Sequence, residues 1–448
     1  MISRRISSSP ALPGTFVRGT PVLASGARGC ASGASVLLLT FLFLLTLLTT
    51  RQVEAQSGIE LADVGASYRF GEHITFSAKI KVSIPIQNVS IIVSDESQTV
   101  RHVEPLTLDA EGGTKFRLDA QQNNLRPFTN VLWNYQFLFP DGSTAQSQTF
   151  FVRYIDDRFG WQTLESGTLR VNWYQGDARF GQAALDSAQL GLGSISRLVP
   201  LDLAQPVEIF IYANTEDLRG TLAPGSETWV AGHADPALGV AMVLIEPGPE
   251  QNIRLEQRIP HELMHVMLYR SVDKGYQNIP AWLREGTATL AEIYPNADYD
   301  RALADAVTKN DLIPLKDLCV SFPAGIDQAF LAYAESRSFT NYLHDTYGST
   351  GLLSLVGAYA DGVDCERGTE RAFGVPLATL EVNWRSSVLG QYAPLSTLQN
   401  ISPYLMLLCL VLIIPFIGIL STLRKTSAAV LRKGSRNEPE SYVRKQTK

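Results

Sequence analysis

The sequence predicts a mixed α+β protein in which a block of strands precedes a block of helices and one long apolar segment lies near the C-terminus. Three observations support this prediction. Residues 67–154 alternate with the period of two typical of strands, residues 253–389 repeat with a helical period, and residues 404–423 carry no charge. The 448 residues are 45% hydrophobic and 18% charged, which excludes wholesale disorder and is typical of two to three folded domains.

The first 55 residues are typical of a targeting segment. Residues 36–48 (VLLLTFLFLLTLL) have the length of a signal-peptide core, and Val53 and Ala55 provide small residues for a cleavage site. We therefore predict a signal peptide over 1–55. Two alternatives stay open, because the long Ser- and Arg-rich stretch before the apolar run also fits a retained anchor or an organelle-targeting segment.

Residues 56–156 predict an antiparallel β-sandwich of immunoglobulin-like type. Residues 74–82 alternate strictly, and the strand pattern at 131–139 is followed by Asp141-Gly142, a dipeptide that favours a hairpin turn. Short strands spaced about ten residues apart are typical of such sandwiches. No group of residues with catalytic chemistry is evident here, so we expect this domain to position or space its neighbour.

Residues 157–395 predict a second domain, in which a small sheet packs on helices. Residues 182–197 have the pattern of an amphipathic helix, and residues 207–212 and 240–245 read as apolar strands. Helical patterns dominate from 253 to 389. Strands followed by helices are typical of the α+β class.

The uncharged segment 404–423 predicts a transmembrane helix. Its 20 residues match the length that crosses a hydrocarbon core of ~30 Å. The tail that follows, 424–448, holds eight basic and two acidic residues, and basic flanks favour the cytoplasm. The sequence thus predicts a cell-membrane protein with a single C-terminal span, an extracytoplasmic middle and a cytoplasmic basic tail.

Charge and cysteine content restrict the partners further. Residues 56–423 hold 25 basic and 41 acidic residues, which argues against nucleic acid because phosphate binding needs a basic face. Within this stretch, Cys319 and Cys365 precede the apolar segment. They either form a disulfide or remain two separately buried thiols.

Residues 261–265 read HELMH, an HExxH motif. Positions four apart share one face of a helix, so His261 and His265 can reach the same metal ion. Glu262 lies beside them, where it can act as a general base toward water. Pro260 directly precedes the first histidine and predicts that the helix begins or kinks there.

A catalytic zinc ion needs a third protein ligand. The six residues after His265 contain no histidine, which excludes the metzincin arrangement. Glu285 follows 20 residues after His265, on a second predicted helix that Pro280 opens, and a helix–loop–helix return can bring it to the metal. A purely structural zinc site is disfavoured, because such sites are closed by four ligands and no cysteine lies near the motif.

The motif HELMH followed by WLREGTA at 282–288 resembles the gluzincin metallopeptidases, the thermolysin-like class. In more detail the chain resembles the bacterial peptidase MA-like membrane proteins, with softer similarities at 154–159, 232–236 and 333–339. The resemblance implies a thermolysin-like zincin fold for residues 157–395.

The resemblance also implies the roles of the motif residues. It places Zn²⁺ on His261, His265 and Glu285, and it makes Glu262 the general base. It further implies that strand 240–245 binds substrate backbone at its edge.

One position departs from the thermolysin-like pattern. Thr289 stands where those enzymes carry an aspartate that orients a zinc-binding histidine. Glu292, one turn further along, could replace that aspartate or could be a solvated carboxylate. Metallopeptidases usually add a Tyr, His or Arg that stabilises the oxyanion, and Tyr333 is our first candidate, with Tyr342 and His233 behind it.

We therefore expect a membrane-tethered, extracytoplasmic zinc-dependent peptidase that hydrolyses peptide or protein substrates. A zinc-activated water would attack the peptide bond, with Glu262 as general base. The alternative is a non-catalytic membrane receptor or interaction protein that retains a metallopeptidase-like shell. The presence of Glu262 favours the enzyme, because a site without catalysis has no chemical need for it.

Overall fold

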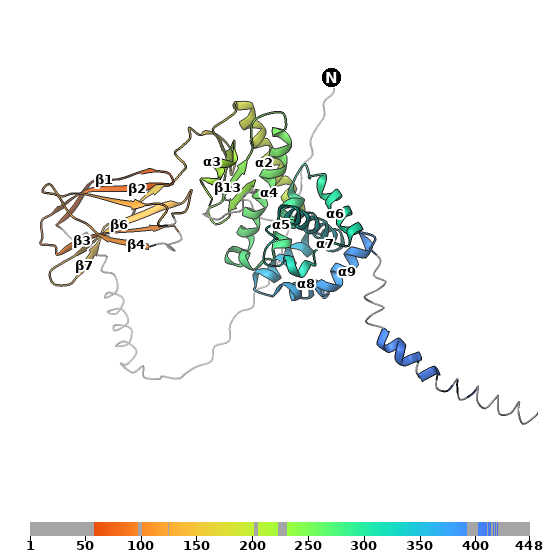
Figure 1. Cartoon of the computed structure of the whole chain (residues 1–448). Coiled ribbons are helices and arrows are strands. Elements are labelled where there is room, and N and C mark those ends of the chain that lie inside the picture. The colour runs from red at the N-terminus through yellow and green to blue at the C-terminus, as the bar shows by residue number, and fades with distance from the viewer. Residues whose placement is uncertain are drawn as a thin grey trace, which may run out of the picture.

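The computed structural model describes residues 58–96, 101–123, 125–200, 205–222, 231–391, 402–409, 411–413, 415, 417 and 419. A β-sandwich lies at one end of the described chain, and a mixed sheet with its helices lies beside it (Figure 1). The predicted leader 1–55 and the basic tail 424–448 fall outside the described residues.

The β-sandwich consists of two antiparallel sheets, with the strand orders β1-β2-β5 and β4-β3-β6-β7, and β8 also pairs with β6. Its strands are β1 (Ile59–Arg69), β2 (His73–Val82), β3 (Asn88–Asp95), β4 (Arg101–Pro105), β5 (Gly113–Asp119), β6 (Asn130–Leu138), β7 (Thr144–Gln146) and β8 (Phe150–Arg153). β1 begins at Ile59, well before residue 67, where the predicted alternation starts. Most of its side chains are half-buried, so its sequence shows only a weak alternation.

The core of the sandwich follows from period-two alternation in the strands. In β2 and β6 every second side chain is buried, so each strand gives one apolar face to the space between the sheets. Phe76 of β2 and Trp133 of β6 meet there, with ring centroids 5.1 Å apart. Packing of the two inner faces stabilises the sandwich through burial of apolar surface.

The second part is built on a five-stranded sheet of order β12-β13-β11-β10-β9. Its strands are β9 (Gln162–Ser166), β10 (Leu169–Trp173), β11 (Val207–Tyr212), β12 (Gly232–Asp235) and β13 (Val240–Leu244). The three central strands are parallel, and β9 and β12 run antiparallel to their neighbours. The periodicity did not predict β9, β10 or β12, which are only four or five residues long.

The apolar runs of β11 and β13 are explained by burial on both faces of the sheet. Ile209 and Ile211 of β11 belong to the large core shared with the helices. Phe210 and Tyr212, which alternate with them, belong to a smaller core on the opposite face. Phe128, from the loop before β6 of the sandwich, completes that smaller core.

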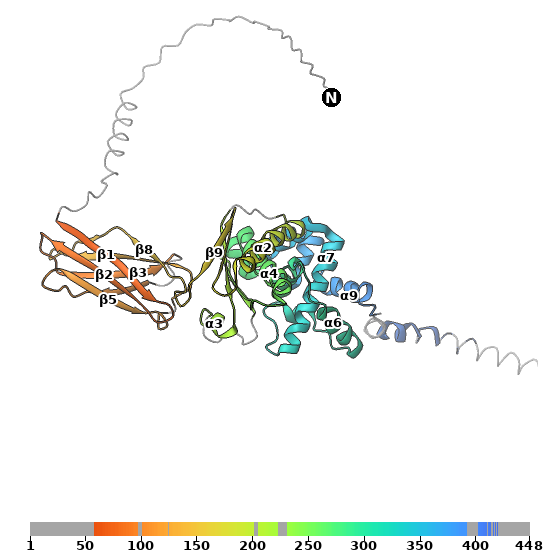
Figure 2. The ribbon, with the colours of Figure 1, turned by 90° about the horizontal axis from the view of Figure 1, so that it is seen from above.

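The helices form the other half of this part and share one core with the sheet. They are α2 (Ala178–Leu198), α3 (Thr215–Arg219), α4 (Gln251–Val272), α5 (Ala281–Ala291), α6 (Asp298–Lys309), α7 (Ile326–Ala360), α8 (Cys365–Phe373) and α9 (Leu377–Ser387), with 3₁₀ turns η1 (Asp273–Asn278) and η2 (Leu315–Leu318). Seen from above, the sandwich, the sheet edge at β9 and the helices follow one another along the molecule (Figure 2). α7 bends at Gly348, whose φ of 71° interrupts the helical backbone.

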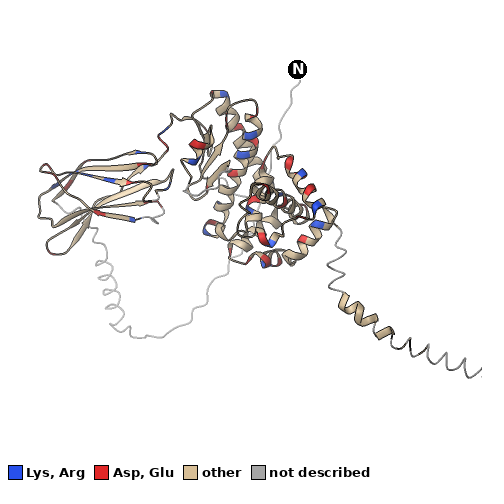
Figure 3. Ribbon diagram, viewed as in Figure 1, with Lys and Arg blue, Asp and Glu red and all other residues tan. Residues whose placement is uncertain are grey.

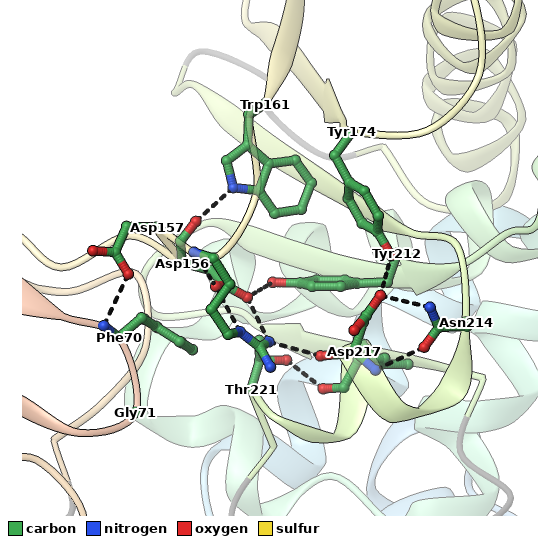
Figure 4. A network of polar contacts seen from close by, with 12 residues as sticks. Phe70, Gly71, Asp156, Asp157, Trp161, Tyr174, Tyr212, Asn214, Asp217 and Thr221 are labelled. Atoms are coloured by element: carbon green, nitrogen blue, oxygen red, sulfur yellow. Dashed lines mark hydrogen bonds and ion pairs between the residues drawn. The ribbon is translucent and has the colours of Figure 1, made fainter.

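A buried polar network joins the sandwich to the mixed sheet (Figure 4). The carboxylate of Asp156, a fully buried residue, accepts hydrogen bonds from Arg158 Nε at 2.8 Å and from the Tyr212 hydroxyl at 3.0 Å. Burial and the charge of Asp156 raise the pKa of Tyr212. The neighbouring Asp157 accepts the backbone N–H of Phe70, at the turn after β1, at 2.9 Å. Hydrogen bonds therefore connect the junction residues 156–158 both to the sandwich and to the mixed sheet.

The prediction of a transmembrane helix at 404–423 is wrong for the part of the chain that the structure describes. No helix there is both long and apolar enough to cross a membrane. The described residues 402–409 carry no charge (Figure 3). The predicted cell-membrane localisation, with an extracytoplasmic catalytic domain and a cytoplasmic tail, depended on that span. This prediction is therefore not supported either.

Cys319 and Cys365 form a disulfide, which resolves the alternative left open by the sequence. The bond joins the end of η2 to the first residue of α8. The carbonyl oxygen of Cys319 accepts the backbone N–H of Ala281, the first residue of α5, at 2.9 Å. The disulfide therefore also supports the start of the helix that carries Glu285.

Candidate metal centre

Helix α4 carries the HExxH motif through the middle of the large core. Glu262 and His265 are buried, with exposed fractions of 7% and 8%, because the helix packs against α2, α5 and the sheet. Leu263 and Met264, between the motif residues, are fully buried. The motif therefore lies on a largely buried stretch of α4.

Pro260 lies inside α4, which begins at Gln251, so the helix does not begin at this proline. Pro260 has no N–H, so the carbonyl of Glu256, four residues earlier, receives no helical hydrogen bond from it. That carbonyl instead accepts the N–H of Ile293 at 2.9 Å. The Glu256 carbonyl, which Pro260 leaves free, thus anchors the backbone just after Glu292.

Helix α5 brings Glu285 to the two histidines. Pro280 precedes the first turn of α5, where a missing N–H costs nothing. Glu285 Oε2 lies 3.4 Å from His261 Nε2 and 3.6 Å from His265 Nε2. One atom of each residue lies within 4.8 Å of the others, in the arrangement of a possible His-His-Glu metal site.

A close contact between α5 and α7 fixes this position. A Cβ atom at Gly286 would lie 2.1 Å from Thr340 Oγ1 and 2.5 Å from the carbonyl oxygen of Ser336. Only glycine permits the two helices to approach this closely. Gly286, next to Glu285, thereby sets how closely α5 packs against α7.

Two side chains brace the outer nitrogens of the histidines. Glu292, at the C-terminal end of α5, has a side chain only 6% exposed and lies 3.1 Å from His261 Nδ1. The hydroxyl of Tyr276 lies 3.1 Å from His265 Nδ1. Glu292 is therefore a buried partner of His261 and not a solvated carboxylate. Sequence reasoning missed Tyr276, since a tyrosine in the loop after the motif gives no pattern of its own.

The charges of this cluster shift one another's pKa values. Burial lowers the pKa of His261, but hydrogen bonds to Glu285 and Glu292 outweigh it and hold this pKa well above its usual value. Burial likewise opposes ionisation of Glu285, and the positive charge of His265 holds its pKa well below the usual range. The cluster is thus a strongly coupled set of acid and base groups of the kind found at functional sites.

A cleft of about 720 Å³ opens over this cluster. Its lining combines the motif residues with the edge strand β12 and with α5 and α7, and it includes Ala231, Gly232, His233, Ala234, Arg258, His261, Glu262, His265, Tyr276, Arg284, Glu285, Glu292, Tyr299, Phe330 and Tyr333. A Cβ at Gly232 would lie 2.3 Å from Glu262 Oε1. β12 therefore passes directly over the Glu262 carboxylate, and glycine makes that passage possible.

The strand that borders the cleft is not the one implied by the resemblance. β13 (Val240–Leu244), within the expected strand 240–245, is an interior strand with β11 on one side and β12 on the other. β12 is the edge strand and contributes three consecutive residues to the cleft. The sequence signal favoured β13 because interior strands are more apolar than edge strands.

The three candidates for oxyanion stabilisation lie in different places. Tyr333 lines the cleft, with its ring centroid 6.1 Å from that of His261. Burial, reinforced by the charges of Glu285 and Glu262, raises the pKa of its hydroxyl well above the usual value. His233 also lines the cleft, from β12. Tyr342 lies further along α7 and stacks on Phe339.

The donor set fits a zinc ion. A carboxylate only accepts hydrogen bonds, so Glu292 keeps a proton on His261 Nδ1, and Nε2, which faces Glu285, is the nitrogen that would exchange its proton for a metal ion. In the same way, Tyr276 opposite His265 Nδ1 leaves that residue's Nε2 to the common point. Two imidazole nitrogens and one carboxylate, with their outer atoms braced, are a usual set of protein ligands for catalytic zinc.

Comparison with known proteins identifies the segment that holds this centre. Residues 187–390 match the Peptidase MA superfamily. The match begins inside α2, and it includes α4, α5 and α7. No curated protein sequence matches the chain.

Solved structures resemble the chain only weakly. A β-1,3-glucan binding domain of carbohydrate-binding module family 56 is 16% identical and covers 21% of this chain and 99% of its own, with a TM-score of 0.16. The sensor domain of the anti-sigma factor RsgI4 from Pseudobacteroides cellulosolvens is 15% identical (22% and 98% covered, TM-score 0.17). OgpA from Akkermansia muciniphila is 18% identical (22% and 30% covered, TM-score 0.18).

The TM-scores are low, and we transfer no ligand or activity from these structures. The superfamily match and the geometry of the buried cluster concern the same segment of the chain. Residues 187–390, which contain the possible His-His-Glu metal site, are thus similar to the Peptidase MA superfamily.

Proposed function

We propose that this protein is a zinc-dependent peptidase, with His261, His265 and Glu285 as the metal ligands. The observation that carries the proposal is the convergence of these three side chains, whose ligand atoms lie within 4.8 Å of one another. The cluster opens onto a cleft large enough for a peptide segment. A zinc ion bound there would supply a Lewis acid that polarises the scissile carbonyl and lowers the pKa of the attacking water.

The residues around the ligands have separate tasks in this proposal. Glu262 accepts the proton of the attacking water and then delivers it to the nitrogen of the leaving amine. Its burial beneath β12 keeps the carboxylate in one orientation. Tyr333 donates its hydroxyl proton in a hydrogen bond to the carbonyl oxygen as negative charge develops there.

The substrate backbone lies along β12 in this proposal. β12 is hydrogen-bonded to β13 on one side, and its other edge has no partner strand within the described residues. An extended peptide can add to such an edge through main-chain hydrogen bonds. Because Gly232 lies against Glu262, a peptide on β12 would bring a backbone carbonyl close to the general base.

Metal analysis and hydrolysis test the proposal together. The purified full-length chain should hold one zinc ion and hydrolyse members of a mixed peptide library, and a chelator should abolish hydrolysis. His261→Ala, His265→Ala and Glu285→Ala should each lose the metal. Full zinc affinity in Glu285→Ala would show that the ligand set is wrong.

Substitution of Glu262 separates an enzyme from a receptor. Glu262→Gln retains the size of the side chain but cannot accept the proton of water, and a general base contributes roughly 10²–10⁴-fold. We expect this variant to retain zinc and to lose at least about a hundredfold in hydrolysis, within that range. Glu250→Gln, an exposed carboxylate at the start of the same helix, is the control. Zinc-loaded wild-type protein with no hydrolysis across the library would favour a receptor.

A further inference from the structure

An ion pair joins the loop before β6 of the β-sandwich to the edge strand of the cleft. Arg126, in the loop before β6, donates from Nε to Asp235 Oδ2 at 2.6 Å and from Nη2 to Asp235 Oδ1. Asp235 is the last residue of β12. A bidentate arginine–carboxylate pair fixes both position and direction, so it is among the stronger polar contacts in proteins.

The two ends of β12 face different parts of the molecule, the cleft and the sandwich. Gly232, His233 and Ala234 line the cleft, whereas Asp235 points to the sandwich and is only 13% exposed at its side chain. Asp235 Oδ1 also accepts the N–H of Leu238 at 3.3 Å, within the turn that leads from β12 into β13. The carboxylate thus fixes the corner at which the edge strand is connected to the sheet.

β12 needs such support because its own pairing is weak. It pairs with β13 over four residues, from Gly232 to Asp235, and with no other strand in the part of the chain described here. A short edge strand with few hydrogen bonds frays more easily than an interior strand. An external contact at Asp235 therefore has a large influence on where the strand lies.

The loop that carries Arg126 is itself anchored in both parts of the molecule. Leu125 is buried in the core of the sandwich, and Pro127 restricts the backbone of Arg126. Phe128 packs against Phe210 of β11 with ring centroids 4.2 Å apart, and its φ of 63° is unusual for an aromatic residue. The surrounding packing must hold this conformation, so the loop offers Arg126 as a rigid support.

We propose that Arg126 is a positioning residue for substrate, and that the sandwich acts through it to hold β12 at the height where an extended peptide reaches Glu262. This inference rests on the proposed peptidase function and adds to it a task for the N-terminal sandwich. The partner it implies is an extended peptide that pairs with β12 over several residues. A minimal substrate that spans only the scissile bond does not depend on the strand.

A second ion pair between the two parts provides a matched control. Arg153 Nη2 of β8 lies 3.2 Å from Glu208 Oε1 of β11. The side chains of this pair are 35% and 14% exposed, which is close to the 35% and 13% of Arg126 and Asp235. Glu208 belongs to an interior strand that does not line the cleft. Arg126→Ala and Arg153→Ala each remove an ion pair between the two parts, and only the first touches β12; Glu208 also keeps Arg170 Nη1 as a partner at 3.4 Å.

Peptide kinetics provide the first measurement. With a peptide of about eight residues, Arg126→Ala should raise KM about tenfold, the effect of losing one charge-assisted hydrogen-bond pair, with kcat changed less than about threefold. Arg153→Ala should change neither value by more than about twofold, because Glu208 lies on an interior strand that does not line the cleft. The charge-reversed double variant Arg126→Asp with Asp235→Arg should bring KM most of the way back to the wild-type value. Arg126→Lys should give an intermediate KM, because lysine cannot bind bidentately.

Amide hydrogen exchange provides a measurement that does not depend on activity. The amides of residues 232–235 should exchange faster in Arg126→Ala than in Arg153→Ala, while those of β13 remain protected in both variants. Equal exchange and equal KM in the two variants would overturn the role of Arg126. If the wild-type chain binds zinc but hydrolyses nothing, the proposed function fails, and the exchange comparison still decides whether the sandwich holds β12.

Discussion

At the scale of single residues, the candidate metal centre depends on groups that bind no metal themselves. Glu292 and Tyr276 lie against the outer nitrogens of His261 and His265. Such partners fix the tautomer and the orientation of a ligand, and they are part of its affinity for metal. Glu292 reaches His261 from the C-terminal end of α5, at a different helical position from Thr289, where the thermolysin-like aspartate would be. The same task is thus performed from another turn.

Replacement of Glu292 should weaken metal binding without unfolding the chain. Glu292→Gln retains the shape of the side chain but removes the negative charge that polarises His261. We expect zinc affinity to fall about 10–100-fold, the usual range for loss of such a partner. Competition with a chromophoric chelator measures the change, with the exposed Glu250→Gln as control. Unchanged zinc affinity would mean that Glu292 is only a neighbour of His261.

At the scale of elements, two backbone contacts place α5. Its first N–H, on Ala281, is held by the carbonyl of Cys319, and the N–H of Ile293 after its end is held by the carbonyl of Glu256 in α4. The first contact relies on a loop that the disulfide fastens to α8, and the second relies on the carbonyl that Pro260 leaves free. Both ends of the helix that carries Glu285 are therefore fastened by features remote from it in sequence.

Removal of the disulfide should reduce global stability. The bond closes a loop between positions separated by 46 residues, and such bonds contribute about 2–4 kcal/mol, mainly by restricting the unfolded chain. The double variant Cys319→Ser/Cys365→Ser should lose about that much free energy of unfolding in urea. Cys409→Ser, which removes a free and exposed thiol, should behave as wild type. Equal midpoints for all three proteins would contradict a stabilising role.

At the scale of the whole molecule, a buried carboxyl links stability to pH. Glu335 of α7 is fully buried, and one of its oxygens accepts the N–H of Ile313 at 2.8 Å. Burial raises the pKa of Glu335 to about 8, against the opposing effects of the Ile313 N–H and the Arg385 charge, while Glu381 and Asp311 add to the rise. Glu335 thus keeps its proton in the folded chain at neutral pH.

The sign of the pH effect follows from that shift. Between the unfolded value of 4.5 and the folded value of about 8, the folded chain holds a proton that the unfolded chain releases. Stability therefore falls as pH rises through this interval, with a slope of up to ~1.4 kcal/mol per pH unit from this group. Glu335→Gln should flatten the dependence of the unfolding free energy between pH 5 and 8, and exposed Glu370→Gln should not. Parallel curves for wild type and Glu335→Gln would contradict the assignment.

The sequence alone indicated much of the local organisation. Period-two alternation located β2 and β6, and the apolar runs located β11 and β13, because burial of one or both faces dictates these patterns. The spacing of His261, Glu262 and His265 on one helix predicted a metal centre, since neighbours four apart on a helix share a face. The proposed third ligand, Glu285, came from spacing and resemblance, and the structure places it within reach of both histidines.

Tertiary structure decided what contacts between distant segments determine. The edge position of β12, the approach of Gly232 to Glu262 and the bracing by Tyr276 involve residues 11 to 30 positions apart, and none leaves a periodic signal. The same is true of Arg126, in a loop of the sandwich, and Asp235, in the mixed sheet, which are 109 positions apart. The sequence also favoured a membrane span at 404–423, because a hydropathy pattern records composition, whereas no helix in the described part of the chain is long and apolar enough to cross a membrane. Local periodicity reports burial along one element, whereas the cleft, its edge strand and its support arise only where separate elements meet.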